Sequence, residues 1–222
     1  MNRKKLIIIG AGDFAREVMY CALQDIGSEV EKWQIVGFID EYSGKMGTTH
    51  ENIEIISFAR AAELNDNSTY FTLGVGEPIV RWKLYDELLK HVPKAQFATI
   101  IHQSTVIMPN AIIEKGVFIG PNTTIAIGCH IKPHVLVNQN VSIGHDCVIG
   151  EFSVISPGCV LSGRTIIGEA TLLGSGVVTY PKVQIGSGCA VSANAVVSRN
   201  LKDNYKQILK PNTMMLPPKQ NG

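Results

Sequence analysis

The sequence has few charged residues and almost no net charge. Lys, Arg, Asp and Glu make up 18% of its 222 residues, and the formal net charge is +1. An average soluble domain has about 25% charged residues. Binding to nucleic acid or to an anionic membrane surface depends on a clustered excess of basic residues. Neither class of partner is therefore expected.

Long hydrophobic runs are also missing. The apolar run at residues 6–9 is ended by Gly10 and Gly12 and is too short for the hydrophobic region of a signal peptide. No other stretch has the length of a membrane span. We therefore expect a cytoplasmic protein without membrane insertion.

Cysteine is scarce, with five residues that lack the spacing of a disulfide framework. Four of them take the same place in a six-residue repeat, and these are Cys129, Cys147, Cys159 and Cys189. We expect packed thiols in a reducing compartment, without a disulfide or a metal site.

The dominant feature that is present is this repeat, which runs from Ile101 to Val197. Stepping by six residues gives an aliphatic side chain at every position except Thr179. The fifth place of each hexad holds a small or β-branched residue, and Gly often follows the aliphatic one. Hexapeptide periodicity predicts a parallel β-helix in which three hexads form one triangular coil. Residues eighteen apart then stack, with the aliphatic column inside.

Residues 1–98 show a different pattern. A predicted buried strand at 5–9 leads into Gly10-Ala11-Gly12-Asp13 and then into a helix through Leu23. A strand, a glycine-rich turn and a helix start form a phosphate-binding context, here as G-x-G-x-x-A. A second strand at 34–39 ends in Asp40-Glu41, and a third at 70–75 runs into Gly76 before a helix at 77–91. The pattern predicts an α/β Rossmann-like half-domain with three or four parallel strands.

The length of this half-domain favours one nucleoside diphosphate over NAD, because a full dinucleotide domain needs about twice as many residues. An acidic residue at the end of the second strand, such as Asp40, commonly binds a ribose hydroxyl. Two plainer interpretations stay open. Gly10 and Gly12 can serve only as a tight turn, and Asp40 can be a solvated strand end or a helix cap.

His145 is the leading catalytic candidate. Its place in the hexad predicts a side chain that points outward from a corner, and Gly163, eighteen residues later, leaves space beside it. An imidazole with a pKa near neutrality suits a general base. Asp146 and Glu151 are both near enough in sequence to orient the ring. On spacing alone, a plain surface histidine is the alternative.

A metal site is the other alternative for the histidines, because some trimeric β-helix proteins are zinc carbonic anhydrases. His130 and His134 are predicted to point outward on other hexads. Neither is separated from His145 by a multiple of eighteen, so we expect no metal.

Residues 138–158, NQNVSIGHDCVIGEFSVISPG, resemble the active-site stretch of bacterial sugar O- and N-acyltransferases of the sialic acid O-acetyltransferase type. The start IIIGAGDFARE, followed directly by hexapeptide repeats, resembles the same family, and the likeness spans nearly all of residues 3–200. It implies an N-terminal Rossmann-like nucleotide-sugar-binding domain at 1–98, an all-β left-handed parallel β-helix at 99–200 and a C-terminal tail at 201–222.

The resemblance also implies an activity. Members of the nucleotide-sugar subgroup use acetyl-CoA to acetylate the 4-amino group of a UDP-, GDP- or dTDP-linked dideoxy sugar, for O-antigen or other surface polysaccharides. It further implies a homotrimer with active sites between subunits and no metal.

The residues that match the family pattern follow. His145 and Asp146 match the catalytic pair. The substrate-binding positions are Gly10, Gly12, Asp13, Asp40, Glu41, Gly76 and Asn138. The acetyl-CoA-binding positions are Ser156, Gly163, Ser175 and Gly176.

Two departures from the family pattern concern the coenzyme region. Many relatives carry a histidine where this chain has Val154. The tail has Pro211, Pro217 and Pro218 in place of the usual G-x-P-A-like turn and is expected to be extended.

Two rival functions remain at this stage. One is an O-acetyltransferase acting on sialic acid or another sugar hydroxyl, and the other is a non-catalytic scaffold or nucleotide-sugar sensor. A covalent mechanism is not expected, because Cys147 is predicted to face a packed corner.

Overall fold

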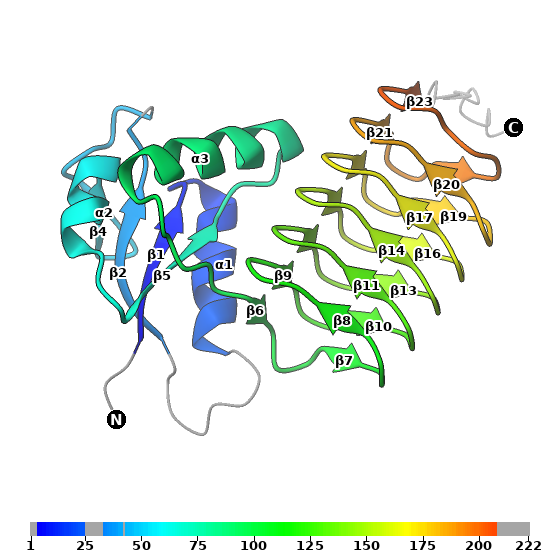
Figure 1. Cartoon of the computed structure of the whole chain (residues 1–222), viewed down its shortest axis with the longest axis horizontal. Helices are drawn as coiled ribbons and strands as arrows, with labels where there is room; N and C mark the ends of the chain where they lie inside the picture. Colours follow the sequence, from blue (N-terminus) through cyan, green and yellow to red (C-terminus); the bar gives the residue numbers. More distant parts are fainter. Residues whose placement is uncertain (1–3, 25–32, 42, 208–222) are drawn as a thin grey trace, which may run out of the picture.

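The computed structural model describes residues 4–24, 33–41 and 43–207, and it consists of an α/β unit beside a stack of triangular coils (Figure 1). The coils form three parallel sheets, as in the predicted left-handed β-helix. The predicted fold class is confirmed. The predicted extended tail from residue 208 onward lies outside the described residues.

The α/β unit is built on a five-stranded sheet with the order β3-β4-β2-β1-β5. Its strands are β1 (Lys4–Ile9), β2 (Trp33–Ile39), β3 (Thr49–His50), β4 (Ile53–Ile56) and β5 (Thr69–Leu73). Strands β4, β2, β1 and β5 are parallel, as predicted, but β3 is antiparallel to β4. Strand β3 was not predicted, because two residues are too few to show an alternating pattern, and the short strand β4 was not located from the sequence either.

In the described part of the α/β unit, three helices cover the sheet, namely α1 (Asp13–Leu23), α2 (Phe58–Leu64) and α3 (Pro78–His91). Helix α1 buries Ala15, Val18, Met19 and Ala22, a spacing that forms one apolar stripe. This stripe packs with Leu6 and Ile8 of β1, whereas α2 and α3 pack with Ile7 and Ile9 on the other face. Pro78 suits the first turn of α3, where its missing N–H leaves no bond unmade.

Each side of the coiled part is one sheet of two-residue strands. The β9 sheet contains β6 (Ile100–Ile101), β9 (Phe118–Ile119), β12 (Leu136–Val137), β15 (Val154–Ile155), β18 (Leu172–Leu173), β21 (Ala190–Val191) and β23 (Lys206–Gln207). The β10 sheet contains β7 (Val106–Ile107), β10 (Thr124–Ile125), β13 (Ser142–Ile143), β16 (Val160–Leu161), β19 (Val178–Thr179) and β22 (Val196–Val197). The β11 sheet contains β8 (Ile112–Ile113), β11 (His130–Ile131), β14 (Val148–Ile149), β17 (Ile166–Ile167) and β20 (Gln184–Ile185).

The repeat column forms the interior of the coils. From Ile119 to Val197 every column residue is buried, and residues eighteen apart pair in register, such as Ile125 with Ile143. Thr179, the polar exception, is also buried. Its hydroxyl oxygen lies 2.8 Å from that of Thr165 and accepts a hydrogen bond of 3.1 Å from the Ser162 N–H. The column therefore tolerates a hydroxyl because its hydrogen bonds are satisfied.

The corners between sheets need a left-handed residue, which glycine and asparagine adopt most easily. At the corner between the β11 and β9 sheets, two bulky residues do so instead. His134 has φ 59° and Phe152 has φ 57°. His134 was predicted to point outward from its hexad, and its side chain does leave the coil, but it is buried against the α/β unit.

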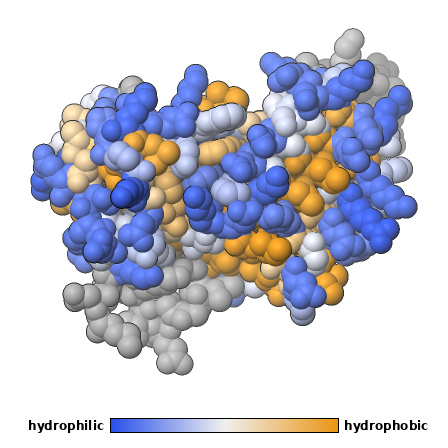
Figure 2. Space-filling view, in the orientation of Figure 1, coloured by the Kyte–Doolittle hydropathy of each residue, from blue (hydrophilic) through white to orange (hydrophobic). Residues whose placement is uncertain are grey.

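The α/β unit covers the β9 sheet. Phe118, Leu136 and Val154 point outward from that sheet and are buried in one cluster with α1. Val154, where many relatives have histidine, thus packs between the two parts. The other two sheets carry exposed apolar side chains, which Figure 2 shows as orange regions over the coils. These include Val106, Val160, Val196, Ile112 and Ile166.

The domain limits drawn at 98/99 and 200/201 stay predictions. The coiled structure continues past residue 200, because Leu201 pairs with Ile185 and β23 pairs with β21.

Candidate functional site

His145 lies in the turn between β13 and β14, at the corner of the β10 and β11 sheets. About half of its side chain is exposed. The ring lies over Gly163 of the next coil. A Cβ atom added to Gly163 would lie 2.8 Å from both Cδ2 and Cε1 of the ring. The space that the sequence predicts above Gly163 is therefore the space that the imidazole fills.

Asp146 holds the other side of the ring. Its Oδ2 lies 2.9 Å from Nδ1 of His145, and Nε of Arg164 lies 3.6 Å from the same oxygen. The hydrogen bond with His145 and the charges of both neighbours lower the pKa of the Asp146 carboxyl, so it is ionised near neutrality. With Nδ1–H donated to the carboxylate, Nε2 carries the lone pair that accepts a proton.

The structure decides between the two candidate carboxylates. Glu151 lies in the turn between β14 and β15, at a different corner from His145, whereas Asp146 is in contact. Nε2 of His145 has no hydrogen-bond partner within the described ranges. The geometry therefore presents one oriented imidazole with an open nitrogen.

The five cysteines are buried free thiols. Cys147 donates a hydrogen bond of 3.3 Å to the Ser162 carbonyl. The neighbouring Cys129 thiol and burial raise the pKa of Cys147. A protonated, enclosed thiol is a poor nucleophile, in agreement with the predicted packed corner.

The predicted nucleotide residues come together at one edge of the α/β sheet. Gly10 follows β1, Asp40 and Glu41 follow β2, and Gly76 follows β5, and these three strands are neighbours. Gly10 has φ 108°, and a Cβ atom there would lie 2.7 Å from Cγ1 of Val75. The turn is thus possible only with glycine. The binding roles of these residues stay predictions.

Two acidic residues at this edge have structural partners. Oδ1 of Asp40 accepts a hydrogen bond of 3.0 Å from Ser43 N. Oε1 of Glu41 accepts one of 2.8 Å from the N–H of Phe58, the first residue of α2. Glu41 therefore caps the start of α2. A helix cap was one of the alternatives that the sequence left open for Asp40. Asp13 and Gly12 begin α1, with Gly12 at the N-cap.

The predicted acetyl-CoA residues lie at two different corners. Ser156, Ser175 and Gly176 lie between the β9 and β10 sheets, whereas Gly163 lies beside His145 between the β10 and β11 sheets. Asn138 lies at the former corner, where its Oδ1 accepts a 2.8 Å bond from Gln139 N. Within one chain, the structure therefore brings Gly163 to His145 but leaves the residues of the other corner apart from it.

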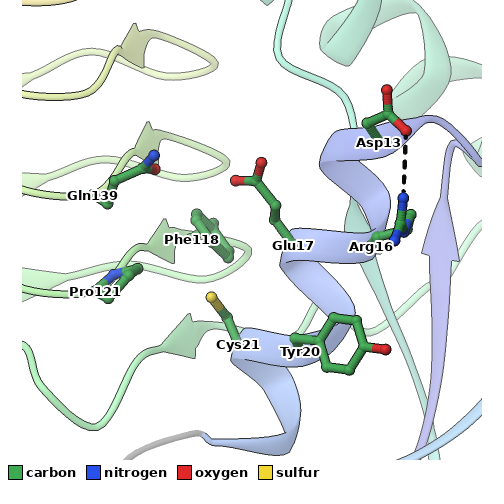
Figure 3. A pocket seen from close by; sticks show the side chains of 8 residues that line it. All are labelled: Asp13, Arg16, Glu17, Tyr20, Cys21, Phe118, Pro121 and Gln139. Atoms are coloured by element: carbon green, nitrogen blue, oxygen red, sulfur yellow. Dashed lines mark ion pairs between the residues drawn. The ribbon is translucent and has the colours of Figure 1, made fainter.

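A cleft of about 500 Å³ separates α1 from the corner that contains Asn138. It is lined by Asp13, Arg16, Glu17, Tyr20, Cys21, Phe118, Pro121 and Gln139. Figure 3 shows the Glu17 carboxylate reaching into it from α1, on the side of Gln139. Arg16 instead pairs with Glu51 at 2.7 Å. Among these residues, only Asp13 was predicted from the sequence to belong to the site. Glu17 follows it by four residues, so the helical period places both on one face.

Other binding features are limited. In the described ranges no three His, Cys, Asp or Glu side chains gather as metal ligands would. Within the same residues, no helix combines the length and the apolarity that a membrane crossing requires.

Two family models match the chain. Residues 5–88 match the PglD N-terminal domain, and residues 128–163 and 164–199 match the bacterial transferase hexapeptide (six repeats). The family resemblance drawn from the glycine-rich turn and the histidine segment is therefore confirmed. No curated protein matches the sequence at a significant level.

Several solved structures share this arrangement. The acetyltransferase domain of PglB from Neisseria gonorrhoeae FA1090, in complex with acetyl coenzyme A, is 26% identical, with a TM-score of 0.80 over 92% of this chain and 96% of that chain. WeeI from Acinetobacter baumannii AYE is 26% identical, with a TM-score of 0.81 over 90% of this chain and 94% of that chain.

A third structure is a histidine-to-asparagine variant of perosamine N-acetyltransferase from Caulobacter crescentus, in complex with CoA and GDP-perosamine. It is 23% identical, with a TM-score of 0.79 over 91% of this chain and 92% of that chain. At this identity the likeness shows a shared fold.

Proposed function

Because residues 5–88 match the PglD N-terminal domain and residues 128–199 match bacterial transferase hexapeptide repeats, we propose that the chain is an acetyl-CoA-dependent sugar N-acetyltransferase. The acceptor is the 4-amino group of a nucleotide-linked 4-amino-4,6-dideoxy sugar. The observation that carries the proposal is the His145–Asp146 pair, which presents a free Nε2 on the coils. The same chain has a parallel sheet whose neighbouring strands β2, β1 and β5 end at the predicted nucleotide-binding residues.

The reaction follows from this geometry. The sugar amine attacks the thioester carbonyl of acetyl-CoA, Nε2 of His145 accepts the amine proton, and the thiolate of CoA leaves. Asp146 keeps the ring oriented and stabilises its charged form. The N–H of Gly163 makes no hydrogen bond among the described residues, so it is free to stabilise the tetrahedral oxyanion.

The two substrates have separate supports. The glycine-rich turn and the N-terminus of α1 suit a diphosphate, because helix N-termini attract anions. The likeness to an acetyl-CoA complex and to a GDP-perosamine complex supports a thioester donor and a nucleotide-linked acceptor. The cleft beside Glu17 lies between α1 and the coils. A sugar whose diphosphate is held at the glycine-rich turn has to lie there to reach a thioester bound on the coils.

We also propose a homotrimer with active sites between subunits. His145 and the Ser156–Gly176 group lie at different corners, so a groove lined by both needs two chains. The two sheets that the α/β unit leaves uncovered carry exposed apolar side chains, including Ile112 at 56% and Val106 at 53% exposure. Burying such side chains favours association. A cytoplasmic enzyme of surface-polysaccharide synthesis fits the free thiols.

The direct test is thiol release from acetyl-CoA with a panel of UDP-, dTDP- and GDP-linked 4-amino-4,6-dideoxy sugars. We expect release with one of them, and no release by the His145→Ala variant. Silence across the panel followed by release with sialic acid would replace the proposal with an O-acetyltransferase. Silence with both acceptor classes would favour a non-catalytic scaffold or sensor.

A further inference from the structure

Arg81 of α3 is fully buried, with 0% of its surface exposed, although no carboxylate in the described ranges forms an ion pair with it. Buried arginine side chains normally have an acidic partner. Burial lowers the pKa of Arg81 to about 9, so the guanidinium still carries its charge near neutrality. Burying such a charge costs free energy, so the hydrogen bonds of the guanidinium have to compensate for it.

Those contacts are three main-chain carbonyls. Nη1 donates to the oxygens of Leu73 at 3.2 Å and Val75 at 2.7 Å, and Nη2 donates to that of His134 at 2.9 Å. Leu73 ends β5 and Val75 follows it in the α/β unit, whereas His134 belongs to a corner of the coils. The planar guanidinium thus joins the two parts of the molecule at a fixed distance.

On the α/β side, Arg81 holds the segment that supports the nucleotide edge. Gly74 N donates 2.8 Å to the Ile9 carbonyl. A Cβ atom on Gly74 would lie 2.9 Å from Cβ of Ala15, and one on Gly10 would lie 3.1 Å from the Gly74 oxygen. Any shift of residues 73–75 therefore moves the glycine-rich turn or the start of α1.

On the coil side, the contact is rigid. The His134 ring stacks on Phe152 with centroids 4.9 Å apart and an interplanar angle of 16°. Tyr85 and Phe97 of the α/β unit each lie 4.6 Å from the His134 ring. Both corner residues adopt the left-handed region that is strained for bulky side chains. Such strain persists only where surrounding packing holds it, and here the packing partner is α3 and its neighbours.

We propose that Arg81 is a positioning residue for the acetyl transfer, which sets the nucleotide-binding edge at a fixed distance from the coils. This inference rests on the proposed function. If the nucleotide sugar is held by the turn at Gly10 while the thioester lies on the coils, this distance decides whether the amine reaches the carbonyl. A displacement of about 1 Å can cost about a hundredfold in rate.

The test compares Arg81→Lys with Arg60→Lys. Lysine keeps the positive charge but cannot span three carbonyls with one planar group. Arg60 is an exposed helix arginine whose one ion pair among the described residues is with Glu63, so it is a matched control. For each variant we would measure the melting temperature, kcat, the KM for each substrate, nucleoside diphosphate binding and hydrogen exchange over residues 73–77 and 10–15.

We expect a folded Arg81→Lys protein in which kcat/KM for the sugar nucleotide falls about a hundredfold while the KM for acetyl-CoA is unchanged. Hydrogen exchange at Gly74 should rise, and the Arg60→Lys variant should match wild type. If Arg81→Lys fails to fold, Arg81→Met supplies the same comparison without a buried charge.

Two failures can be told apart. A wild-type protein that binds no nucleoside diphosphate and transfers no acetyl group overturns the proposed function. A wild-type protein that does both, with Arg81→Lys showing unchanged sugar-nucleotide kinetics, overturns the role of Arg81 alone. If kcat/KM falls equally for both substrates, in proportion to a lowered melting temperature, Arg81 has only a structural role. That result would also overturn the positioning role.

Discussion

The Nδ1 atom of His145 lies 2.9 Å from Oδ2 of Asp146, the next residue in the chain. Adjacent residues can face each other in this way because Asp146 has φ 58°, which turns its side chain back toward the ring. The left-handed corner that the β-helix requires therefore also builds the His145–Asp146 pair that we propose to be catalytic, and the pair needs no distant segment to orient it.

Replacing His145 with Ala should abolish most turnover and leave the fold intact. The side chain is half exposed, and its loss removes the proton acceptor, which contributes about a hundredfold to ten-thousandfold to the rate. Steady-state thiol release and the melting temperature would be measured together. Retention of most activity would remove His145 from the mechanism.

Asp146→Asn should lower kcat by about ten- to a hundredfold with little change in either KM. Asparagine adopts the left-handed backbone readily, so the corner is preserved and only the carboxylate is lost. Arg164→Gln is the comparison variant, because Arg164 is 3.6 Å from the carboxylate and does not contact the ring. A kcat equal to wild type for Asp146→Asn would show that the ring is oriented by other contacts.

Gly163→Ala should lower the activity without unfolding the protein. The added methyl group would occupy the position of the His145 ring, 2.8 Å from Cδ2 and Cε1, and would push the exposed imidazole aside. We expect a loss of about tenfold or more in kcat, since the reacting nitrogen is displaced. Ser162→Ala, one residue away, should behave as wild type. Similar activity in both variants would mean that the ring does not need this position.

The part of this site that the sequence predicts is the part set by periodicity. The hexad spacing alone places Gly163 beside His145, because residues eighteen apart stack in a coil of three hexads. It cannot choose between Asp146 and Glu151, since that depends on which corner each carboxylate occupies. The structure separates them by one full side of the triangle.

The contacts between the two parts of the chain were beyond sequence analysis. His134 reads as an outward corner residue, and only the position of α3 reveals that its ring is buried. Arg81 lies in the helix predicted at 77–91, and no sequence pattern singles it out. Packing between distant segments leaves no periodic pattern in the sequence. The burial of these two side chains therefore could not be predicted from either segment alone.

Acidic conditions should destabilise the protein through His134. Burial, and then the charges of Arg81 and Lys115, lower its pKa from 6.5 to about 3. Between these values the unfolded chain binds a proton that the folded protein does not, so stability falls as the pH drops below 6.5. The expected loss between about pH 7 and about pH 5 is about 2 kcal/mol.

Urea unfolding of wild type and His134→Asn at both pH values would measure this loss. Asparagine suits the left-handed backbone at this position and does not titrate. The variant should be less stable overall, because the ring stack is lost, but its difference between the two pH values should shrink. An unchanged difference would assign the acid sensitivity to other groups.

If active sites form between subunits, two inactive variants should restore activity when they assemble together. His145→Ala lacks the base. Gly12→Asp adds a carboxylate at the turn that is proposed to hold the diphosphate, and no atom lies within 4 Å of a Cβ atom at that position, so the fold tolerates the change.

Each variant alone should be nearly inactive. In a mixed assembly, one chain's intact turn can meet a neighbour's intact His145. Random mixing of equal amounts should give about one quarter of the wild-type activity per site in the whole mixture, and about one third in mixed trimers purified over both tags. Co-expression with two different tags, purification over both and light scattering would give the mixed species and its mass. A mixed trimer without activity would place the turn and the histidine of each site in one chain. The structure argues against this, because the α/β unit covers the β9 sheet and His145 lies at the opposite corner, between the β10 and β11 sheets.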